Sequence, residues 1–332
     1  MLIVVSAPGK VTLFGEHAVV YGEPAIAAAI DKRVRVKAIK RADEAVRIEA
    51  RDLMLAGFKA LLSSNGSVTL EGESKKVLAA LSYVKRAIEI VREKYGVKVG
   101  AHITITSEMP VGAGLGTSAA VAVSVIKAYS LLAGLEFSKE ECADLGYQVE
   151  LSVQGKASRM DSTTTAIGGI LYIDPRGERV YENIKCTSDL RGFIVGYVSR
   201  EASTGEMVEK VKKLREKSPE IIDLVIKAMG ELTRKARGLI ERGELYEVGM
   251  LMNINHGLLE AIGVSTSRLS QMVYAARSAG ALGSKITGAG GGGCIIALAP
   301  EREEEVIAAL KAIGVSAFKV AFSSEGVRVE EG

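Results

Sequence analysis

A glycine-rich segment has the residue types and the spacing of a phosphate-binding loop. Alternate glycines let the backbone approach a ligand closely, and the unpaired amides that begin the following helix attract an anion. The hydroxyls of Thr117 and Ser118 can bind phosphate or Mg²⁺. The segment reads Pro110-Val111-Gly112-Ala113-Gly114-Leu115-Gly116-Thr117-Ser118.

This loop differs from two well-known phosphate-binding patterns. A Walker loop requires a lysine directly after its last glycine, where this chain has Thr117. A dinucleotide-binding fingerprint requires an acidic residue at the end of a strand about 20 residues further on, and no predicted strand ends in this way. An ordinary strand-to-helix turn remains the alternative. The alternating glycines followed by two hydroxyls favour the phosphate loop.

Two further segments carry polar residues among glycines. The first reads Ser6-Ala7-Pro8-Gly9-Lys10-Val11-Thr12-Leu13-Phe14-Gly15-Glu16-His17-Ala18-Val19-Val20-Tyr21-Gly22. The second reads Lys285-Ile286-Thr287-Gly288-Ala289-Gly290-Gly291-Gly292-Gly293-Cys294, and an apolar strand pattern follows it. Taken in chain order, the segments 6–22, 110–118 and 285–294 resemble the three motifs of the GHMP kinases. This is the family of galactokinase and of homoserine, mevalonate and phosphomevalonate kinases. The resemblance extends from Ser6 to about Val320.

The N-terminal segment, residues 6–22, is most similar to the first motif of the mevalonate kinase branch. Galactokinases hold their sugar with an aspartate just after the Glu-His pair, and Ala18-Val19-Val20 offers no carboxylate there. Phosphomevalonate kinases usually carry tyrosine in place of His17. The resemblance therefore implies transfer of the ATP γ-phosphate to the 5-hydroxyl of mevalonate in isoprenoid biosynthesis. Phosphomevalonate kinase, or another small-molecule kinase of the family, is the alternative. A ligand sensor of this fold without turnover is the alternative from another class.

The resemblance also implies individual roles. Ser118 and Glu150 would ligate Mg²⁺, Asp161 would be the catalytic aspartate, and Lys10 would lie beside it. Taken alone, Glu150 would be an exposed helix carboxylate, Asp161 a turn or helix-cap residue and Lys10 an exposed strand lysine. Their order relative to the glycine motifs favours the functional roles. Asp161 could accept the proton of the alcohol. Alternatively, Asp161 could orient the alcohol's hydroxyl while Lys10 lowers the pKa of that hydroxyl, because a loose transition state needs little help from a base.

Mevalonate carries a carboxylate, which requires a cation. Arginine binds a planar carboxylate best, so we expect Arg200 to hold it, with Thr204 as a hydroxyl contact. A surface arginine is the alternative. Glu16 and His17 would close the other side of the substrate.

The third motif has two compatible interpretations. Gly288, Gly290 and Gly291 support the site, because they let the chain pass close to the phosphates, or they form a tight packing turn before a strand. The sequence Ala157-Ser158-Arg159-Met160 departs from the Pro-Ser-Gly of many relatives, and the role of Arg159 stays open.

Composition is typical of a globular protein, with 48% hydrophobic and 25% charged residues among 332. A net charge of +3 is too small to indicate a nucleic-acid surface. Cys142, Cys186 and Cys294 are widely spaced, which is typical of reduced thiols. No apolar run could span a bilayer, and Leu2–Val5 is too short for a signal peptide. We expect a cytoplasmic enzyme with small-molecule partners, ATP and mevalonate, and without nucleic-acid or membrane partners. A homodimer is compatible with this chain.

The elements that position these residues alternate between strand and helix patterns. Strands are predicted at residues 2–5, 34–40, 46–50, 68–70, 101–106 and 168–173, and helices at 75–94, 118–132 and 139–153. Asp161 falls at a turn. A second unit begins near residue 193 with a strand, several helices between 205 and 279, the glycine-rich strand, helix 301–313 and strand 317–320. Periodicity alone indicates mixed α and β layers. The resemblance implies an α+β fold with two domains, residues 1–182 and 183–332. The first would be ribosomal-protein-like and bind ATP, the second ferredoxin-like, and the active site would lie in the cleft between them.

Overall fold

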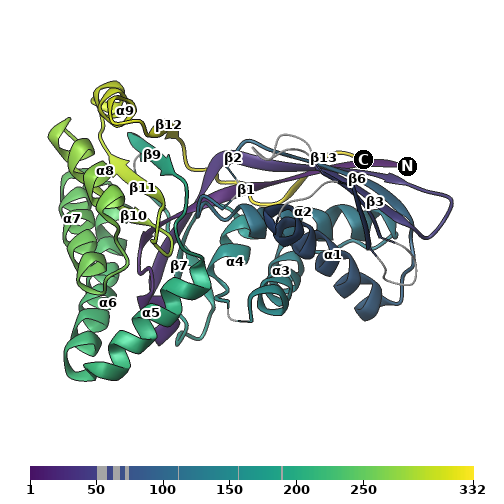
Figure 1. The fold of residues 1–332 in the computed structure, drawn as a ribbon, viewed down its shortest axis with the longest axis horizontal. Helices are drawn as coiled ribbons and strands as arrows, with labels where there is room; N and C mark the ends of the chain where they lie inside the picture. Colours follow the sequence, from purple (N-terminus) through teal and green to yellow (C-terminus); the bar gives the residue numbers. More distant parts are fainter. Residues whose placement is uncertain (51–57, 63–67, 72–74, 111, 156, 188–189) are drawn as a thin grey trace.

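The computed structural model describes all residues except 51–57, 63–67, 72–74, 111, 156 and 188–189 (Figure 1). Its elements in chain order are β1 Leu2–Phe14, the 3₁₀ turn η1 Ala18–Tyr21, β2 Ala25–Lys40, β3 Val46–Ala50, β4 Phe58–Leu62, β5 Val68–Glu71, α1 Lys75–Tyr95, β6 Ala101–Ser107, α2 Thr117–Leu132, α3 Lys139–Gln154, α4 Met160–Ile167, β7 Ile170–Ile173, β8 Tyr181–Asn183, β9 Phe193–Val198, α5 Thr204–Lys217, α6 Pro219–Arg242, α7 Leu245–Ala261, α8 Ser267–Ser278, β10 Gly283–Thr287, β11 Gly293–Leu298, α9 Glu303–Ala312, β12 Ser316–Val320 and β13 Arg328–Glu331.

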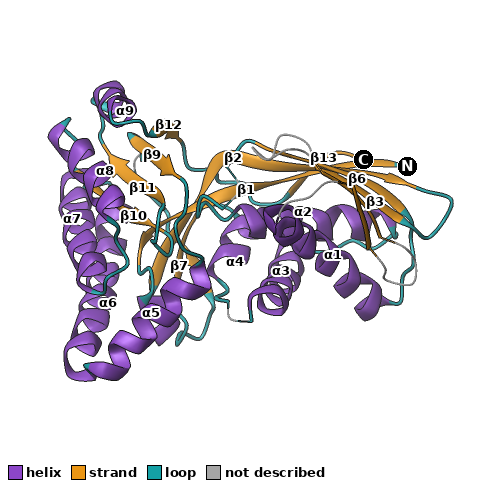
Figure 2. Ribbon diagram, viewed as in Figure 1, coloured by secondary structure: helices purple, strands orange, loops and turns teal. Residues whose placement is uncertain are grey.

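A long antiparallel pair, β1 and β2, forms the centre of the larger sheet. The order of its main path is β13-β1-β2-β6-β3-β4-β5, and β7 also pairs with β2. Helices α1 to α4 cover one face of this sheet (Figure 2). Helix α2 is built almost entirely of small and apolar residues and is buried on nearly all sides, so it packs directly on β1 and β2. This packing places the N-terminus of α2 beside the middle of β1.

The smaller sheet has the order β10-β11-β9-β12, and all its pairs are antiparallel. In chain order these strands and their crossovers follow the β-α-β-β-α-β pattern of a ferredoxin-like fold. Four helices, α5 to α8, occupy the first crossover. Helices α7 and α8 pack on β10, and the long helices stand at the left of the molecule in Figure 1. The prediction of an α+β fold with two domains is confirmed.

The end of the chain returns to the larger sheet. β13 pairs with β1, so the N- and C-termini lie side by side (Figure 1). Residues 328–331 therefore belong spatially with the first unit, although the predicted division at 182/183 assigns them to the second. The division itself remains a prediction.

Two strands are longer than the sequence patterns predict. The sequence pattern predicts a first strand at residues 2–5, but β1 continues through Pro8-Gly9 to Phe14, with a change of register between Pro8 and Lys10. The alanine-rich stretch 25–30 has little intrinsic strand preference, yet it is fully buried within β2. Burial between neighbouring strands overrides local propensity at both places. The predicted turn at Asp161 is instead the first turn of helix α4.

No helix in the described part of the chain combines the length and the apolar character needed to cross a bilayer.

Candidate active site

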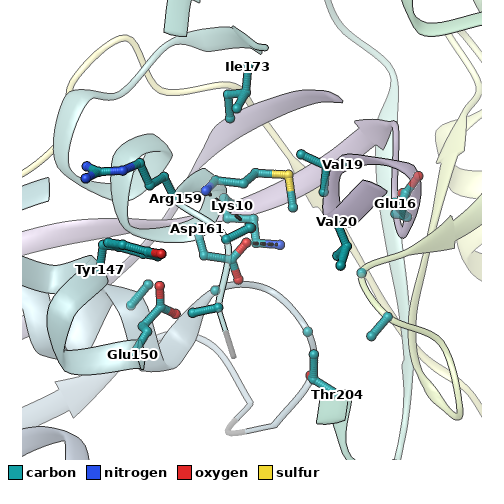
Figure 3. A pocket seen from close by; sticks show the side chains of 18 of the residues that line it. Lys10, Glu16, Val19, Val20, Tyr147, Glu150, Arg159, Asp161, Ile173 and Thr204 are labelled. Carbon is teal, nitrogen blue, oxygen red and sulfur yellow. Dashed lines mark hydrogen bonds and ion pairs between the residues drawn. The ribbon is translucent and has the colours of Figure 1, made fainter. Parts of the chain in front are cut away.

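A cavity of about 530 Å³ lies between the domain of the larger sheet and the domain of the smaller sheet, and residues from both domains line it (Figure 3). Most of the predicted site residues are among its walls: Lys10, Glu16, His17, Gly112, Gly114, Gly116, Thr117, Ser118, Glu150, Asp161, Arg200, Thr204 and Gly288. Residues predicted for the site that do not line this cavity are Pro110, Ala113, Leu115, Gly290 and Gly291. Val111 lies outside the described residues.

The glycine-rich loop alternates between the cavity and the core. Ala113 and Leu115 are completely buried and belong to the main hydrophobic core. Gly112, Gly114 and Gly116, with φ of 76°, 88° and 70°, adopt the left-handed backbone conformation that favours glycine. Helix α2 begins directly after them, and no side chain in the described part of the chain caps its first turn. Its first amides are therefore available to an anion in the cavity.

Lys10 and Asp161 form an ion pair in the wall of the cavity. Lys10 Nζ lies 2.8 Å from Oδ1 of Asp161, and the side chains are 3% and 31% exposed. The Lys10 ammonium also donates to the Thr12 hydroxyl at 3.3 Å. The backbone of Lys10 is tied to the phosphate loop, because its N–H donates to the Leu115 carbonyl at 2.8 Å. The middle of β1 thus presents a buried amine beside the N-terminus of α2.

Glu150 lies on α3 and points into the cavity near Asp161 (Figure 3). It is buried, and among the described residues its Oε2 has no hydrogen-bond partner. Burial raises the pKa of this carboxyl, and the negative charge of Asp161 raises it further. Burial also raises the pKa of the neighbouring Tyr83 hydroxyl to about 12. A cation in the cavity would satisfy the unpaired Glu150 oxygen.

Arg200 spans the phosphate loop and the third glycine motif. Its Nη1 donates to the Thr204 hydroxyl at 3.0 Å. A Cβ placed on Gly114 would lie 3.1 Å from its Nη2, and one on Gly293 would lie 3.2 Å from its Nε. Burial lowers the pKa of this guanidinium, and the Asp161 carboxylate acts in the opposite direction. The structure therefore brings a partly desolvated cation to the cavity wall.

The glycines of the third motif follow two geometries. A Cβ on Gly288 would lie 3.3 Å from the Gly114 carbonyl, so the two glycine loops run in contact. Gly290 and Gly291 instead pack tightly, since a Cβ would meet the Val264 carbonyl at 2.2 Å or the Met207 sulfur at 2.6 Å. Close approach and packing thus coexist within one run.

Glu16 and His17 form one wall, but their polar atoms are engaged with the second domain. The Glu16 carboxylate pairs with the buried Lys285 and accepts from Asn255 Nδ2 at 3.2 Å. His17 Nε2 lies 2.9 Å from the Ala289 carbonyl. Because a carbonyl can only accept, Nε2 carries the hydrogen and Nδ1 is the acceptor. Burial lowers the pKa of His17 and so favours this neutral form.

Arg159 lies at the rim of the cavity, where the sequence departs from the usual family pattern. It forms an ion pair with Asp144 and lies over the Tyr147 ring, 4.7 Å from the centroid. The sequence did not predict either partner. Both lie on α3, one turn apart, and only the folded chain brings them next to Arg159.

Four residues of the site's surroundings were not identified from the sequence: Thr12, Asn255, Lys285 and Thr287. Thr12, Lys285 and Thr287 lie inside the quoted motifs. Their place near the site could therefore be predicted from the sequence, but their hydrogen-bond partners could not. Thr12 and Thr287 hydrogen-bond each other although 275 residues separate them. Asn255 lies in an ordinary helical segment that carries no motif.

Comparison with known proteins gives a consistent result. Residues 82–169 match the N-terminal domain of the GHMP kinases, and residues 236–316 match their C-terminal domain. A protein named mevalonate kinase from Thermococcus sibiricus is 48% identical, over 100% of this chain and 99% of its own length. The mevalonate kinase of Pyrococcus furiosus is also 48% identical, with the same coverage.

Solved structures agree with these matches. The crystal structure of the Methanococcus jannaschii mevalonate kinase has a TM-score of 0.78 at 29% identity, over 97% of this chain and 98% of the other. That of the L. major mevalonate kinase in complex with R-mevalonate has a TM-score of 0.81 at 25% identity, over 97% and 96%. With both family domains matched and full-length relatives at 48% identity, the chain belongs to the GHMP kinase family.

Proposed function

We infer that this protein is a kinase that transfers the γ-phosphate of ATP to the 5-hydroxyl of mevalonate. Its full-length relatives carry the name mevalonate kinase, and the cavity holds the groups that such a transfer requires. The observation that carries the chemistry is the pairing of Lys10 with Asp161, 2.8 Å apart, beside an uncapped helix N-terminus.

The triphosphate would lie on the glycine-rich loop. The left-handed glycines at 112, 114 and 116 keep side chains away from this surface, and the first amides of α2 point toward it. The Thr117 hydroxyl donates to the Pro110 carbonyl at 3.3 Å, so it stabilises the loop. Ser118 lines the cavity, and its hydroxyl, which is also a hydrogen-bond partner of Tyr83, would turn to a phosphate oxygen or a metal ion.

The residues of the cavity fit a magnesium ion. Glu150 offers a buried carboxylate oxygen that has no partner among the described residues, and Ser118 offers a hydroxyl. Mg²⁺ commonly takes one or two protein oxygens together with substrate phosphates and water. When bound, it would supply positive charge that neutralises the negative charge developing during transfer. Ser118 and Glu150 are therefore its proposed ligands.

Asp161 and Lys10 would act on the acceptor alcohol. The Asp161 carboxylate accepts a hydrogen bond from the hydroxyl and aligns its oxygen with the phosphate. The Lys10 ammonium stabilises the negative charge that grows on that oxygen and on the moving phosphoryl group. The proton leaves to Asp161 at the end of the transfer, or directly to the transferred phosphate.

Mevalonate would lie between His17 and Arg200. Arg200 supplies a guanidinium for the carboxylate, and Thr204 holds that guanidinium through a hydrogen bond of 3.0 Å. His17 presents a neutral ring from the other side. Glu16 would act indirectly in this arrangement, because its carboxylate is paired with Lys285.

The proposed cellular location is the cytoplasm. Cys142, Cys186 and Cys294 are free thiols in the structure, in keeping with a reducing compartment.

The reaction is tested by supplying the purified protein with MgATP and, separately, mevalonate, phosphomevalonate, galactose and homoserine, while ADP release is followed. Turnover with mevalonate alone is expected. The Asp161→Asn protein, purified in parallel, controls for contaminating kinases and should show almost no release. Preferred turnover on phosphomevalonate would contradict the substrate, and no turnover on any acceptor would support a ligand sensor.

A further inference from the structure

A buried ion pair joins the two domains behind the His17 wall of the cavity. Lys285, on β10, is completely buried, and the Glu16 side chain is 1% exposed. The Lys285 ammonium donates to one oxygen of the Glu16 carboxylate. The other oxygen accepts from Asn255 Nδ2, on α7, at 3.2 Å. Glu16 belongs to the N-terminal domain, and both oxygens of its carboxylate are therefore held by the C-terminal domain.

Glu16 is the middle residue of a turn with a restricted backbone. Gly15 has a φ of 88°, and a Cβ there would lie 2.4 Å from the Pro24 carbonyl. His17 has a φ of 61°, which is rare for a residue with a side chain. Surrounding contacts must maintain such a conformation. The contacts to Glu16 and the bond from His17 to the Ala289 carbonyl supply that restraint.

The same strand, β10, also holds the backbone that carries Lys10. Lys285 Nζ donates to the Thr12 carbonyl at 3.4 Å. Thr287 accepts from the Thr12 N–H at 2.8 Å and donates to the Thr12 carbonyl at 3.1 Å. The Thr12 hydroxyl in turn accepts from the Lys10 ammonium. Contacts from β10 thus reach both the wall at His17 and the amine at Lys10.

A purely structural role is the competing explanation. Buried ion pairs often add little stability, because removing two charges from water offsets their attraction. An apolar pair would serve as well if packing were the only requirement. Here the pair instead fixes the direction of a turn whose next residue, His17, lines the cavity. Small displacements of reacting groups lower rates steeply, so geometry is what such a pair can supply.

We propose that Lys285 is a positioning residue for phosphoryl transfer, which acts through Glu16 and Thr12 to fix His17 and Lys10 against the acceptor alcohol. Lys285 is not among the residues that line the cavity. The proposal rests on the proposed function, and it assigns Glu16 to the same network.

The test is a double-mutant cycle with Lys285→Met and Glu16→Gln in the full chain. Lys285→Met leaves Glu16 buried without its partner, so the melting temperature should fall. The double variant contains no unpaired charge and should recover most of that loss. Its kcat/KM for mevalonate should nevertheless stay about tenfold or more below wild type, because the fixed geometry is gone. KM for ATP should change less than about twofold, since the phosphate loop is intact.

Asn255→Ala and Asn253→Ala form a matched pair that does not create a buried charge. Asn255 holds Glu16, whereas Asn253 ties α7 to β10 through the Leu282 carbonyl and the Ser284 N–H. Both variants should lose thermal stability. Measured well below the melting temperature, only Asn255→Ala should raise KM for mevalonate.

Recovery of kcat/KM together with melting temperature in the double variant would overturn the proposal. Equal kinetics for Asn255→Ala and Asn253→Ala would do the same, and this comparison decides the matter if Lys285→Met does not fold. Wild-type turnover is measured in the same assay. Its absence with mevalonate would contradict the proposed function instead of the positioning role.

Discussion

The Lys10 ammonium lies 2.8 Å from Asp161 Oδ1 and is held by the Thr12 hydroxyl at 3.3 Å. The amine is almost fully buried, whereas the carboxylate is partly exposed toward the cavity. An alcohol entering the cavity therefore meets the carboxylate first, with the positive charge behind it. This arrangement binds a hydroxyl and favours negative charge on its oxygen.

Asp161→Asn should reduce kcat while leaving the nucleotide bound. The amide keeps the shape of the side chain, but it cannot accept the proton or hold the hydroxyl as a charged group does. We expect kcat to fall by roughly 10² to 10⁴, with the dissociation constant of ATP, measured by calorimetry, changed only a few-fold. Asp144→Asn, at the rim, is the control carboxylate. Parallel losses of ATP affinity and turnover would argue against the catalytic role.

Arg200→Leu should raise KM for mevalonate. A charge-assisted hydrogen bond contributes about 1.5–3 kcal/mol, which corresponds to roughly 10- to 100-fold in affinity. Thr204→Val should have a smaller effect, because it removes only the hydrogen bond that orients Arg200. Arg159→Leu is the matched control, since that arginine also lines the cavity but pairs with Asp144. An unchanged KM for Arg200→Leu would remove Arg200 from the substrate site.

Two glycines of the phosphate loop should respond differently to alanine. Both Gly112 and Gly116 have a left-handed φ, so alanine introduces comparable backbone strain of about 1 kcal/mol at each. A Cβ at Gly112 meets none of the described residues within 4 Å, whereas one at Gly116 would lie 2.7 Å from Lys10 Cγ. Gly116→Ala should therefore displace Lys10 and lower kcat well beyond the effect of Gly112→Ala. Steady-state kinetics at saturating ATP distinguish the two, and equal losses would mean that Lys10 is not displaced.

The sequence identified the polar residues of the cavity but not their partners. Lys10, Glu150 and Asp161 were predicted from the order of the motifs. No periodicity in the sequence indicates that residues so far apart in the chain lie together. The direction of Glu16 was not foreseen. Its carboxylate points to Lys285 because both groups are buried and each needs a partner of opposite charge, and only the folded chain shows which one is in reach.

Local patterns failed where tertiary burial decides the structure. Pro8-Gly9 has the composition of a strand end, yet β1 continues past it because β2 pairs with β1 both before and after this step. The alanine-rich start of β2 gives no alternating pattern, because all of it is buried. The ferredoxin-like unit was predicted from family resemblance, and its strand order could not be read from periodicity.

Glu150→Gln should weaken the response to Mg²⁺ and stabilise the protein without it. Burial and the Asp161 charge disfavour the ionised carboxylate, and a neutral amide removes that repulsion. We expect a higher melting temperature in EDTA, and an Mg²⁺ concentration for half-maximal activity that rises about tenfold or more. Glu140→Gln, on the exposed start of α3, serves as the control. A lower melting temperature in EDTA would mean that the carboxylate stabilises the metal-free fold.

Acid should destabilise the protein through His256. This ring is buried on α7, and the charged groups that face it are Glu260 on the same helix, Arg277 on α8 and Lys285 on β10. Burial, together with the two cations and against the effect of Glu260, lowers its pKa to about 4.

The sign of this effect follows from proton binding. Between the unfolded pKa, about 6.5, and the folded value of about 4, the unfolded chain binds one more proton at His256 than the folded protein. The unfolding free energy therefore falls as pH decreases through this range. His17, whose pKa burial also lowers, adds to the slope in the same direction.

His256→Gln should flatten part of this acid slope, because glutamine does not titrate. Urea unfolding at several pH values between 4 and 7.5 measures it. The same substitution at His102, which lies on β6 with 41% of its side chain exposed, is the matched control. A slope in His256→Gln as steep as that of the wild type would show that other groups dominate acid unfolding.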